Sequence, residues 1–319
     1  MTLTRIFFTS DVHGSEVCFI KFLNAAKYYQ AGVLILGGDI TGKMIVPIIE
    51  QPDGTFESNF VGSQVIVRSP PELENLEKNI RNSGYYPYMT TPAEMEKLEN
   101  DKKLLDDLFS SVMAENVKRW VSIAEQRLKG SNVRCYISPG NDDRFDIDNS
   151  LKSSSVVLCP EDQVVRIDNT HEMITSAWTN PTPWHSPRET SEEQLRSIIG
   201  QMISKVEHME TCIFNLHCPP YGSPLDVAPE LDENLAPKVS GGGGSVSMIH
   251  VGSIAVREAI EKNQPLLGIH GHIHEARGFV KIGKTMCINP GSEYGEGILR
   301  GALINIDEKS VKSYLLTQG

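Results

Sequence analysis

Acidic, amide and imidazole side chains recur in this sequence directly after short apolar runs. Seven of them are of types that bind metal ions: Asp11 and His13 in DVHG, Asp39 in GGDI, Asn141 in GNDD, His217 in NLHCPP, and His272 with His274 in GHIH. Each motif alone is weak, because polar turns after strands have the same composition. Together these nitrogen and oxygen donors suit Mn, Fe, Zn or Ni, and a shared carboxylate can bridge two such ions about 3.5–4 Å apart. That arrangement activates water against phosphoesters.

Apolar runs before these residues predict the strands that position them. Residues 5–9 and 33–36 are short apolar runs, and residues 16–29 between them repeat apolar side chains with helical spacing behind a possible Ser15 cap. Alternation of strand and helix is typical of an α/β sheet. In such sheets ligands gather at the carboxyl ends of the strands, where Asp11, His13 and Asp39 fall.

The second half of the chain is rich in expected strands. They cover residues 133–137, 155–158, 164–167, 173–176, 212–216, 279–282, 285–289, 302–306 and 311–315, and two expected helices cover 192–207 and 252–262. Between His217 and Gly252 lies a long segment with four consecutive glycines, Gly241 to Gly244, which we interpret as a mobile surface loop.

Residues 43–130 differ in character and are interpreted as an insertion. Residues 45–49 and 64–67 flank Pro52-Asp53-Gly54 and predict an antiparallel hairpin. Residues 92–129 contain neither Gly nor Pro after Pro92 and keep helical spacing of apolar residues up to Gly130. The insertion is therefore expected to be largely helical, a hairpin plus long helices. It could serve as a lid or as the surface of a homodimer, and the sequence does not choose between them.

Length, charge and cysteine usage limit the class of protein. A chain of 319 residues fits two domains, or one catalytic domain with a large insertion. The net charge of −11 and the lack of basic runs argue against nucleic acid as a partner. The sequence has no apolar stretch of membrane-spanning length and no signal-peptide pattern at its start. Six cysteines without a CxxC pair are typical of reduced thiols, so we expect a cytoplasmic protein.

The order D-x-H, G-D, G-N-x-D, H, G-H-x-H resembles the calcineurin-like metallophosphoesterase family. The resemblance covers about residues 1–42 and 131–310 and leaves the insertion outside. Two further fragments, HCPPYGSPLD and the NPGS at residues 289–292, are similar to the small bacterial and archaeal branch of that family.

The resemblance implies a fold, a ligand set and a nucleophile. The fold is α/β, a four-layer αββα sandwich of two mixed β-sheets flanked by helices, here a single domain over residues 1–319. A hydroxide that bridges two divalent transition-metal ions, manganese among the candidates, would be the nucleophile. The implied ligands are Asp11, His13 and His274 for one ion, Asn141, His217 and His272 for the other, and Asp39 as the bridge between them.

One position departs from the family pattern, which reads GNHD or GNHE. Asp142 stands in place of the histidine that protonates the leaving oxygen, and an ionised Asp142 could not donate a proton unless desolvation or Asp143 raised its pKa. His250 is a candidate substitute acid, although a loop or capping role suits it as well. Arg144 is either a phosphate contact or a solvated surface residue.

These observations predict a dinuclear metal-dependent phosphoesterase that hydrolyses a small phosphodiester or phosphomonoester. The first alternative is a metal-binding protein of the same fold with little turnover, a regulator or scaffold, because the histidine is missing. The second is a nuclease, which the acidic balance disfavours. Retention of all seven ligand types favours the enzyme.

Overall fold

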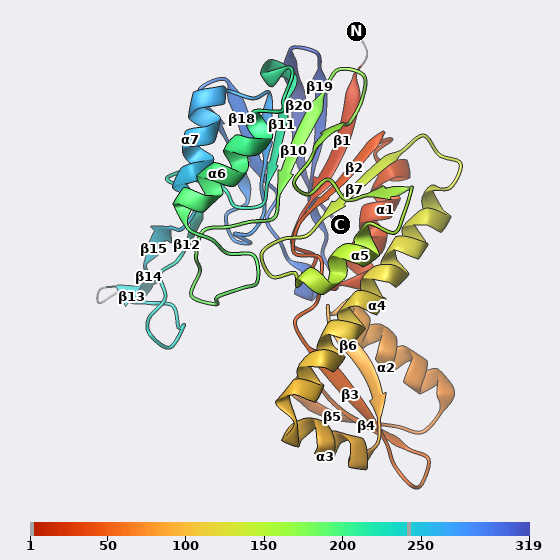
Figure 1. Cartoon of the computed structure of the whole chain (residues 1–319). Helices are drawn as coiled ribbons and strands as arrows, with labels where there is room; N and C mark the ends of the chain where they lie inside the picture. Colours follow the sequence, from red (N-terminus) through yellow and green to blue (C-terminus); the bar gives the residue numbers. More distant parts are fainter. Residues whose placement is uncertain (1–2, 241–243) are drawn as a thin grey trace.

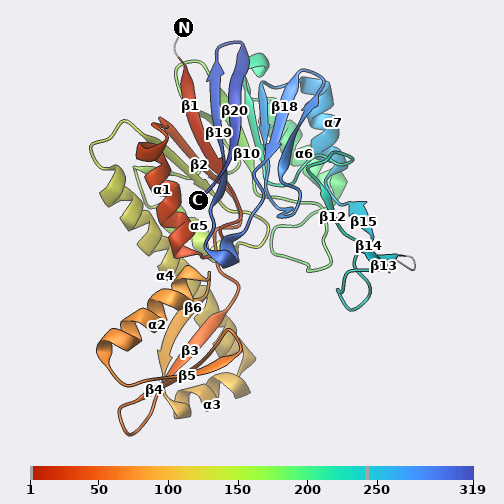
Figure 2. The same cartoon turned by 180° about the vertical axis from the view of Figure 1, so that it is seen from behind.

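Two six-stranded sheets face each other in the computed structural model, which describes residues 3–240 and 244–319 (Figure 1). The first sheet has the strand order β20–β19–β1–β2–β7–β8, and the second has the order β17–β18–β16–β11–β10–β9. Helices cover the outer face of each sheet (Figure 2). The expected α/β class and four-layer αββα sandwich are confirmed.

The first sheet is parallel at its centre and antiparallel at one side. Its parallel strands are β1 (Thr4–Thr9), β2 (Val33–Gly37), β7 (Arg134–Ser138) and β8 (Val157–Leu158), and its antiparallel strands are β19 (Arg300–Asp307) and β20 (Ser310–Gln318). Because β1, β2 and β7 run the same way, their carboxyl ends lie at one edge of the sheet.

The second sheet repeats this plan with antiparallel strands at both edges. Its parallel strands are β10 (Glu172–Ser176), β11 (Ile213–Leu216), β16 (Leu267–Ile269) and β18 (Thr285–Asn289), and its edges are β9 (Val164–Arg166) and β17 (Gly278–Ile282). The sequence analysis missed β16, because three residues that include a glycine make too short a pattern to identify.

Alternate side chains of each strand bury themselves on opposite faces. Ile6 and Phe8 of β1 point into the core between the sheets, where they join Ile213, Ile269 and Ile288 of the second sheet. Phe7 points the other way and packs with the helices. This period of two places apolar residues on both faces of a central strand, as expected for a sheet covered on both sides.

Four helices cover the sandwich. On the first sheet lie α1 (Glu16–Tyr28) and α4 (Lys102–Leu128), where Phe19 stacks on Trp120 with ring centroids 4.2 Å apart. On the second lie α6 (Glu192–Ile203) and α7 (Ile254–Asn263). Shorter turns are α5 (Asp148–Leu151) and 3₁₀ helices at Phe145–Ile147, Met209–Thr211 and Tyr294–Glu296. Within residues 3–240 and 244–319, no helix combines the length and apolar character needed to cross a bilayer.

The insertion contains a four-stranded sheet with the order β5–β4–β3–β6. Its elements are β3 (Ile45–Glu50), β4 (Phe56–Phe60), β5 (Ser63–Val67), α2 (Pro70–Asn82), β6 (Tyr86–Thr90) and α3 (Pro92–Asn100). The turn at residues 52–54 joins β3 to β4, and β4 separates the two strands that the sequence analysis placed in one hairpin. The polar residues 57–59 concealed β4. The long helical stretch divides at Asp101, whose carboxylate accepts hydrogen bonds from the backbone nitrogens of Lys103 and Leu104.

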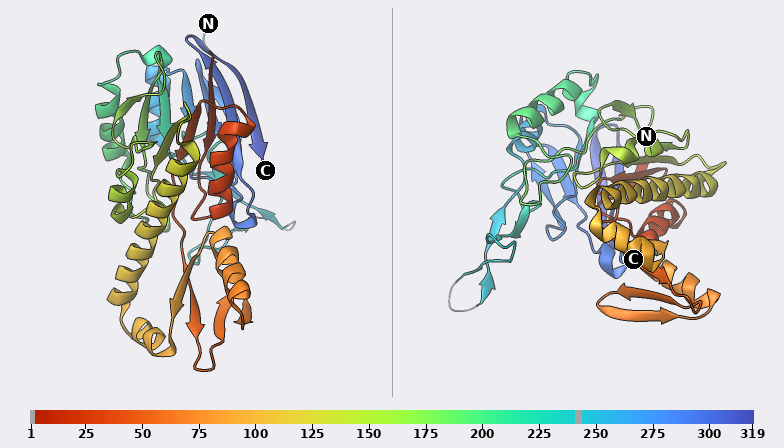
Figure 3. Two further views of the ribbon diagram at one scale, coloured as in Figure 1. Left: turned by 90° about the vertical axis from the view of Figure 1, so that its right-hand side faces the viewer. Right: turned by 60° about the horizontal axis from the view of Figure 1, so that its bottom comes forward.

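The insertion sits directly on the loop after β1 (Figure 3). Ser15 Oγ donates a hydrogen bond to the carbonyl oxygen of Asn82 at 2.7 Å, and Gly42 N donates to the hydroxyl of Tyr86 at 2.7 Å. A Cβ on Gly84 would lie 2.4 Å from the carbonyl oxygen of His13, so only glycine permits this approach. The insertion therefore lies close enough to this edge of the sheets for its residues to take part in a site there.

The segment between β11 and α7 is more structured than the expected loop. It holds four short strands, β12 (Val227–Pro229), β13 (Val239–Ser240), β14 (Ser245–Val246) and β15 (Met248–His250), in an arm that projects from the sandwich (Figures 1 and 3). Strands of two or three residues carry no recognisable period, which explains the difference. Of the four consecutive glycines, Gly241–Gly243 lie outside the described residues.

Candidate metal centre

The seven predicted ligands follow five parallel strands that end at one edge of the sandwich. Asp11 and His13 follow β1, Asp39 follows β2, Asn141 follows β7, His217 follows β11, and His272 with His274 follow β16. Five of them are almost fully buried, and His272 and His274 are partly exposed. The site thus opens toward solvent on the side of the HGHIH loop.

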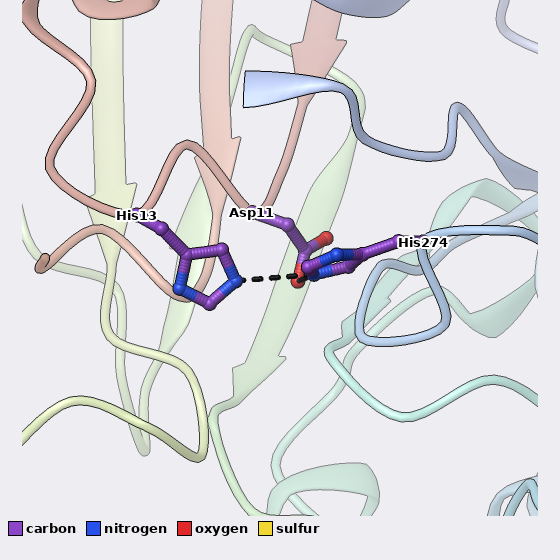
Figure 4. Close-up of side chains that lie close together, drawn as sticks. All are labelled: Asp11, His13 and His274. Carbon is purple, nitrogen blue, oxygen red and sulfur yellow. Dashed lines mark hydrogen bonds and ion pairs between the residues drawn. The ribbon is translucent and has the colours of Figure 1, made fainter. Parts of the chain in front are cut away.

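The first group consists of Asp11, His13 and His274, whose ligand atoms lie within 4.8 Å of one another. The Nε2 atoms of His13 and His274 are 3.1 Å apart, and Nε2 of His274 lies 3.6 Å from Oδ1 of Asp11 (Figure 4). Both imidazole rings point toward the carboxylate from different loops. Convergence of two nitrogens and a carboxylate oxygen is suited to a divalent transition metal.

The second group consists of Asp39, His217 and His272, again within 4.8 Å. Asp39 stands between the groups. Its Oδ1 lies 3.5 Å from Nε2 of His217, and its Oδ2 lies 3.7 Å from Nε2 of His13. The two oxygens of one carboxylate therefore face imidazoles of different groups, which is the geometry a bridging carboxylate requires.

Asn141 lies beside the second group and is oriented by a hydrogen-bond chain. Its Nδ2 donates to Ser186 Oγ at 2.7 Å, and that hydroxyl donates to Oε1 of Glu189 at 2.7 Å. Asp142 N donates to Oδ1 of Asp39 at 2.9 Å. Because the amide nitrogen is engaged, Oδ1 of Asn141 is the atom left to face the site.

Three buried atoms of the cluster lack hydrogen-bond partners among the described residues: His13 Nδ1, Asn141 Oδ1 and His217 Nε2. His217 Nδ1 contacts the carbonyl oxygen of Gly37 at 3.0 Å, so Nδ1 carries a proton and Nε2 is the nitrogen that faces Asp39. Unpartnered buried polar atoms are costly, and a bound cation would satisfy Asn141 Oδ1 and His217 Nε2.

Two glycines leave room for the ligands. A Cβ on Gly140 would lie 2.2 Å from Asp39 Oδ1, and one on Gly271 would lie 2.4 Å from Asp11 Oδ2. Four of the seven predicted ligands, Asp11, His13, Asp39 and His272, have left-handed backbones with φ between 38° and 67°. Such conformations are unfavourable for non-glycine residues and gather at functional sites. The close glycines and the left-handed backbones thus allow the predicted ligands to lie close together.

The protonation states of Asp11, His13 and His272 suit metal binding. Burial would raise the pKa of Asp11, but His274 and His217 outweigh it and bring it to about 2. Burial lowers the pKa of His13 to about 3 and that of His272 to about 4, so both imidazoles are neutral at pH 7. Burial would lower the pKa of His217, but Asp39 and Asp11 raise it to about 10. The carboxylates therefore favour a positive charge at Nε2, which a metal ion supplies as well as a proton.

Asp142 faces Lys43 at the entrance of the site. Lys43 Nζ lies 2.5 Å from Asp142 Oδ2, which is also 4.0 Å from His13 Nδ1. Burial and the carboxylate of Asp39 raise the pKa of Asp142 above its usual range, while Lys43 acts in the opposite direction. Asp143 is engaged elsewhere, since its carboxylate accepts hydrogen bonds from the loop after β2.

The structure does not bring His250 into either group. Its Nδ1 lies 2.8 Å from Oδ1 of the buried Asp226, and its backbone pairs with Val227 in the arm. Asp226 also accepts hydrogen bonds from the backbone nitrogens of Gly222 and Gly252. The contact between His250 and Asp226 therefore helps to hold this loop in place. Arg144 likewise pairs with Asp106 of α4 at 2.7 Å.

Sequence reasoning missed the residues that support the ligands. Lys43, Ser186 and Glu189 stand in no recognisable motif, and only the structure brings them to the site. His270 adds a third histidine to the HGHIH loop, but its Nδ1 donates to the carbonyl oxygen of Leu216 at 2.8 Å. Burial lowers its pKa to about 4. His270 is thus engaged by the last residue of β11 and belongs to neither ligand group.

The sequence matches none of the protein family models with which it was compared. A curated relative, the uncharacterized protein MJ1162 of Methanocaldococcus jannaschii, is 30% identical over 154 residues, which are 48% of this chain and 61% of the relative. The match thus spans under two thirds of that relative's length.

Two solved structures share the fold. One is 15% identical with a TM-score of 0.61 over 99% of both chains. The other, TT1561 of Thermus thermophilus, is 11% identical with a TM-score of 0.55 over 100% of this chain and 99% of its own. At such identities the similarity concerns the architecture alone.

Proposed function

We propose that this protein is a dinuclear metal-dependent phosphoesterase of the calcineurin-like type that hydrolyses a small phosphorylated substrate. Two ligand groups at one sheet edge support the proposal, together with the motif order in the sequence. Bound divalent ions would polarise the phosphoryl group and lower the pKa of a water molecule. Asp11, His13 and His274 would hold one ion and Asn141, His217 and His272 the other, with Asp39 shared.

The position of Asp39 carries the proposal. Asp39 presents one oxygen to His217 of the second group and the other to His13 of the first. Placing two dications close together is unfavourable unless a negative charge lies between them. Asp39 supplies that charge from a buried position.

The chain's own residues fix the donor atoms. The carbonyl oxygen of Gly37 accepts a hydrogen bond from Nδ1 of His217 and so keeps Nε2 toward the site. His272 N donates to both oxygens of Asp11, at 3.0 and 3.1 Å, which orients that carboxylate between the groups. Such preorganised donors need no rearrangement when a substrate binds.

The substrate class follows from charge. The net charge of −11 disfavours a nucleic acid, and a compact phosphoester needs no extended basic surface. Repulsion by Asp142 would favour a diester monoanion over a monoester dianion. However, Lys43 neutralises much of that charge, so the proposal covers both ester classes.

A hydrolysis assay tests the proposal. Protein stripped with a chelator and then reconstituted with Mn, Fe, Zn or Ni should hydrolyse bis(4-nitrophenyl) phosphate or 4-nitrophenyl phosphate, and stripped protein should not. Asp107→Asn on the exposed surface of α4 is the matched control and should equal wild type. Full metal loading without ester hydrolysis across a panel of diesters and monoesters would instead favour a metal-binding protein with little turnover.

A further inference from the structure

Lys43 is the first residue of the insertion and directly follows two residues whose backbone is held by hydrogen bonds. Thr41 N donates to Oδ1 of Asp143 at 2.8 Å, and Gly42 N donates to the hydroxyl of Tyr86 at 2.7 Å. A Cβ on Gly42 would lie 2.1 Å from the carbonyl oxygen of Gly84. The start of the Lys43 side chain is therefore fixed, although the side chain itself is half exposed.

The ammonium group of Lys43 is aimed at the metal centre by Asp142. Nζ lies 2.5 Å from Oδ2 of Asp142, a carboxylate that is 22% exposed. Asp142 is itself anchored, since its backbone nitrogen donates to Oδ1 of the buried Asp39 at 2.9 Å. Asp142 thus links a cation at the rim to the carboxylate at the centre of the site.

A cation at this place has a specific chemical use. Asp142 stands at the entrance of the site, so an approaching phosphate meets its negative charge before it reaches the ligands. An ammonium carries three N–H donors, and Asp142 engages at most part of them. Among the described residues, Asp142 is the partner that Lys43 Nζ has within hydrogen-bond distance, so the other N–H donors are free for a ligand.

We propose that Lys43 binds a non-bridging oxygen of the substrate phosphate and that Asp142 is its positioning residue. This inference rests on the proposed phosphoesterase function and adds a substrate contact supplied by the insertion. The insertion then contributes directly to the site, beyond any role as a lid or an interface. Asp142 holds the ammonium in place and donates no proton in this account.

The test combines phosphate binding with a steady-state assay on metal-loaded full-length protein. The variants are Lys43→Ala, Lys43→Arg and Asp142→Asn, and the control is Lys103→Ala on the exposed surface of α4. Calorimetry gives the dissociation constant of inorganic phosphate, metal analysis gives the ion content, and thermal unfolding reports folding.

A charge-assisted hydrogen bond to phosphate predicts a loss of about tenfold or more in phosphate affinity for Lys43→Ala, with KM for the ester raised similarly and metal content unchanged. Lys43→Arg should retain most of the affinity, because it keeps the charge and the donors. Asp142→Asn should show a smaller loss through the mispositioned ammonium. Lys103→Ala should match wild type.

Phosphate affinity and KM within about twofold of wild type in a folded, metal-loaded Lys43→Ala protein would overturn the assignment of Lys43. If wild type binds phosphate through Lys43 but hydrolyses no ester, the anion site stands and the proposed function fails. If loaded wild type hydrolyses esters while Lys43→Ala is unaffected, the function stands and this inference fails.

Discussion

Oδ1 of Asp143 accepts hydrogen bonds from both the backbone nitrogen and the hydroxyl of Thr41, at 2.8 and 2.6 Å. Its Oδ2 accepts from the backbone nitrogens of Ile40 and Gly140, at 3.0 and 2.7 Å. One fully buried carboxylate therefore joins the loop after β2, which carries Asp39, to the loop after β7, which carries Asn141. The distance between two proposed ligands depends on a residue that binds neither metal nor substrate.

Asp143→Asn should destabilise the protein by about 2–3 kcal/mol, because an amide NH₂ would face backbone donors that need an acceptor. Urea unfolding measures this loss, and metal titration should show weaker binding at the same time. Asp107→Asn, which changes an exposed carboxylate in the same way, should leave both unchanged. Unaltered stability of Asp143→Asn would contradict the joining role.

Ser186→Ala should weaken the binding of one metal ion, since Asn141 loses the acceptor that orients its amide. Loss of such a supporting hydrogen bond costs about 10–100-fold in metal affinity. Competition with a chromophoric chelator measures the two affinities separately. Ser197→Ala on the exposed face of α6 is the control. Wild-type affinity at both sites would show that Ser186 does not position Asn141.

Gly84→Ala should disturb the loop that carries His13, because the added Cβ would lie 2.4 Å from the carbonyl oxygen of His13. Gly54→Ala is a matched control: its φ of +80° is close to the +85° of Gly84, but a Cβ there meets nothing within 4 Å. Both variants bear the penalty of a left-handed backbone at an L-residue, about 1–2 kcal/mol. Only Gly84→Ala should lose further stability and metal affinity, as thermal unfolding and metal titration can show. Equal stability and metal affinity of the two variants would show that this contact of the insertion does not support the site.

Glu161 should make the protein less stable as the pH rises. Burial raises the pKa of Glu161 to about 8, so the folded chain keeps a proton that the unfolded chain loses near its ordinary pKa of about 4.3. Between these values stability falls as pH rises, by at most about 1.4 kcal/mol per pH unit. Glu161→Gln keeps an acceptor for Ala177 N and should remove this dependence.

Unfolding by urea at several pH values between about 5 and 8 checks the Glu161 prediction. Glu161→Gln should be more stable than wild type at the upper end of that range and nearly equal to it at the lower end. Glu233→Gln, at an exposed position of the arm, serves as the control. A difference between Glu161→Gln and wild type that does not vary with pH would refute the assignment.

The sequence could predict five of the proposed ligands, Asp11, His13, Asp39, Asn141 and His217, because each follows a buried parallel strand with a recognisable apolar pattern. His272 and His274, which follow the unpredicted β16, were identified by the GHIH motif alone. Apolar runs such as residues 33–36 identify the strand, and the polar residue after it must lie at the carboxyl edge. Asp39 and Asn141 were reached this way without knowledge of their contacts. The motif locates such a side chain in the sequence. The parallel sheet then brings the ends of neighbouring strands, and the side chains after them, to one edge.

Other features depend on contacts that no local pattern records. Lys43 and Asp142 lie far apart in the sequence and pair because the loops after the neighbouring parallel strands β2 and β7 lie side by side. Ser186 is an ordinary loop serine until the fold places it beside Asn141. Within the insertion, the polar residues of β4 conceal a strand that the neighbouring strands stabilise by backbone pairing. Tertiary context decides in each of these cases.

Metal analysis of Asp39→Asn tests the central claim, a shared carboxylate between two metal ions, most directly. The variant keeps an oxygen for the hydrogen bond from Asp142 N but loses the negative charge. Wild type and the Asp107→Asn control should bind two divalent ions per chain, and Asp39→Asn should bind at most one with the original affinity. Two ions bound to Asp39→Asn with unchanged affinity would contradict the bridge and the two-metal account built on it.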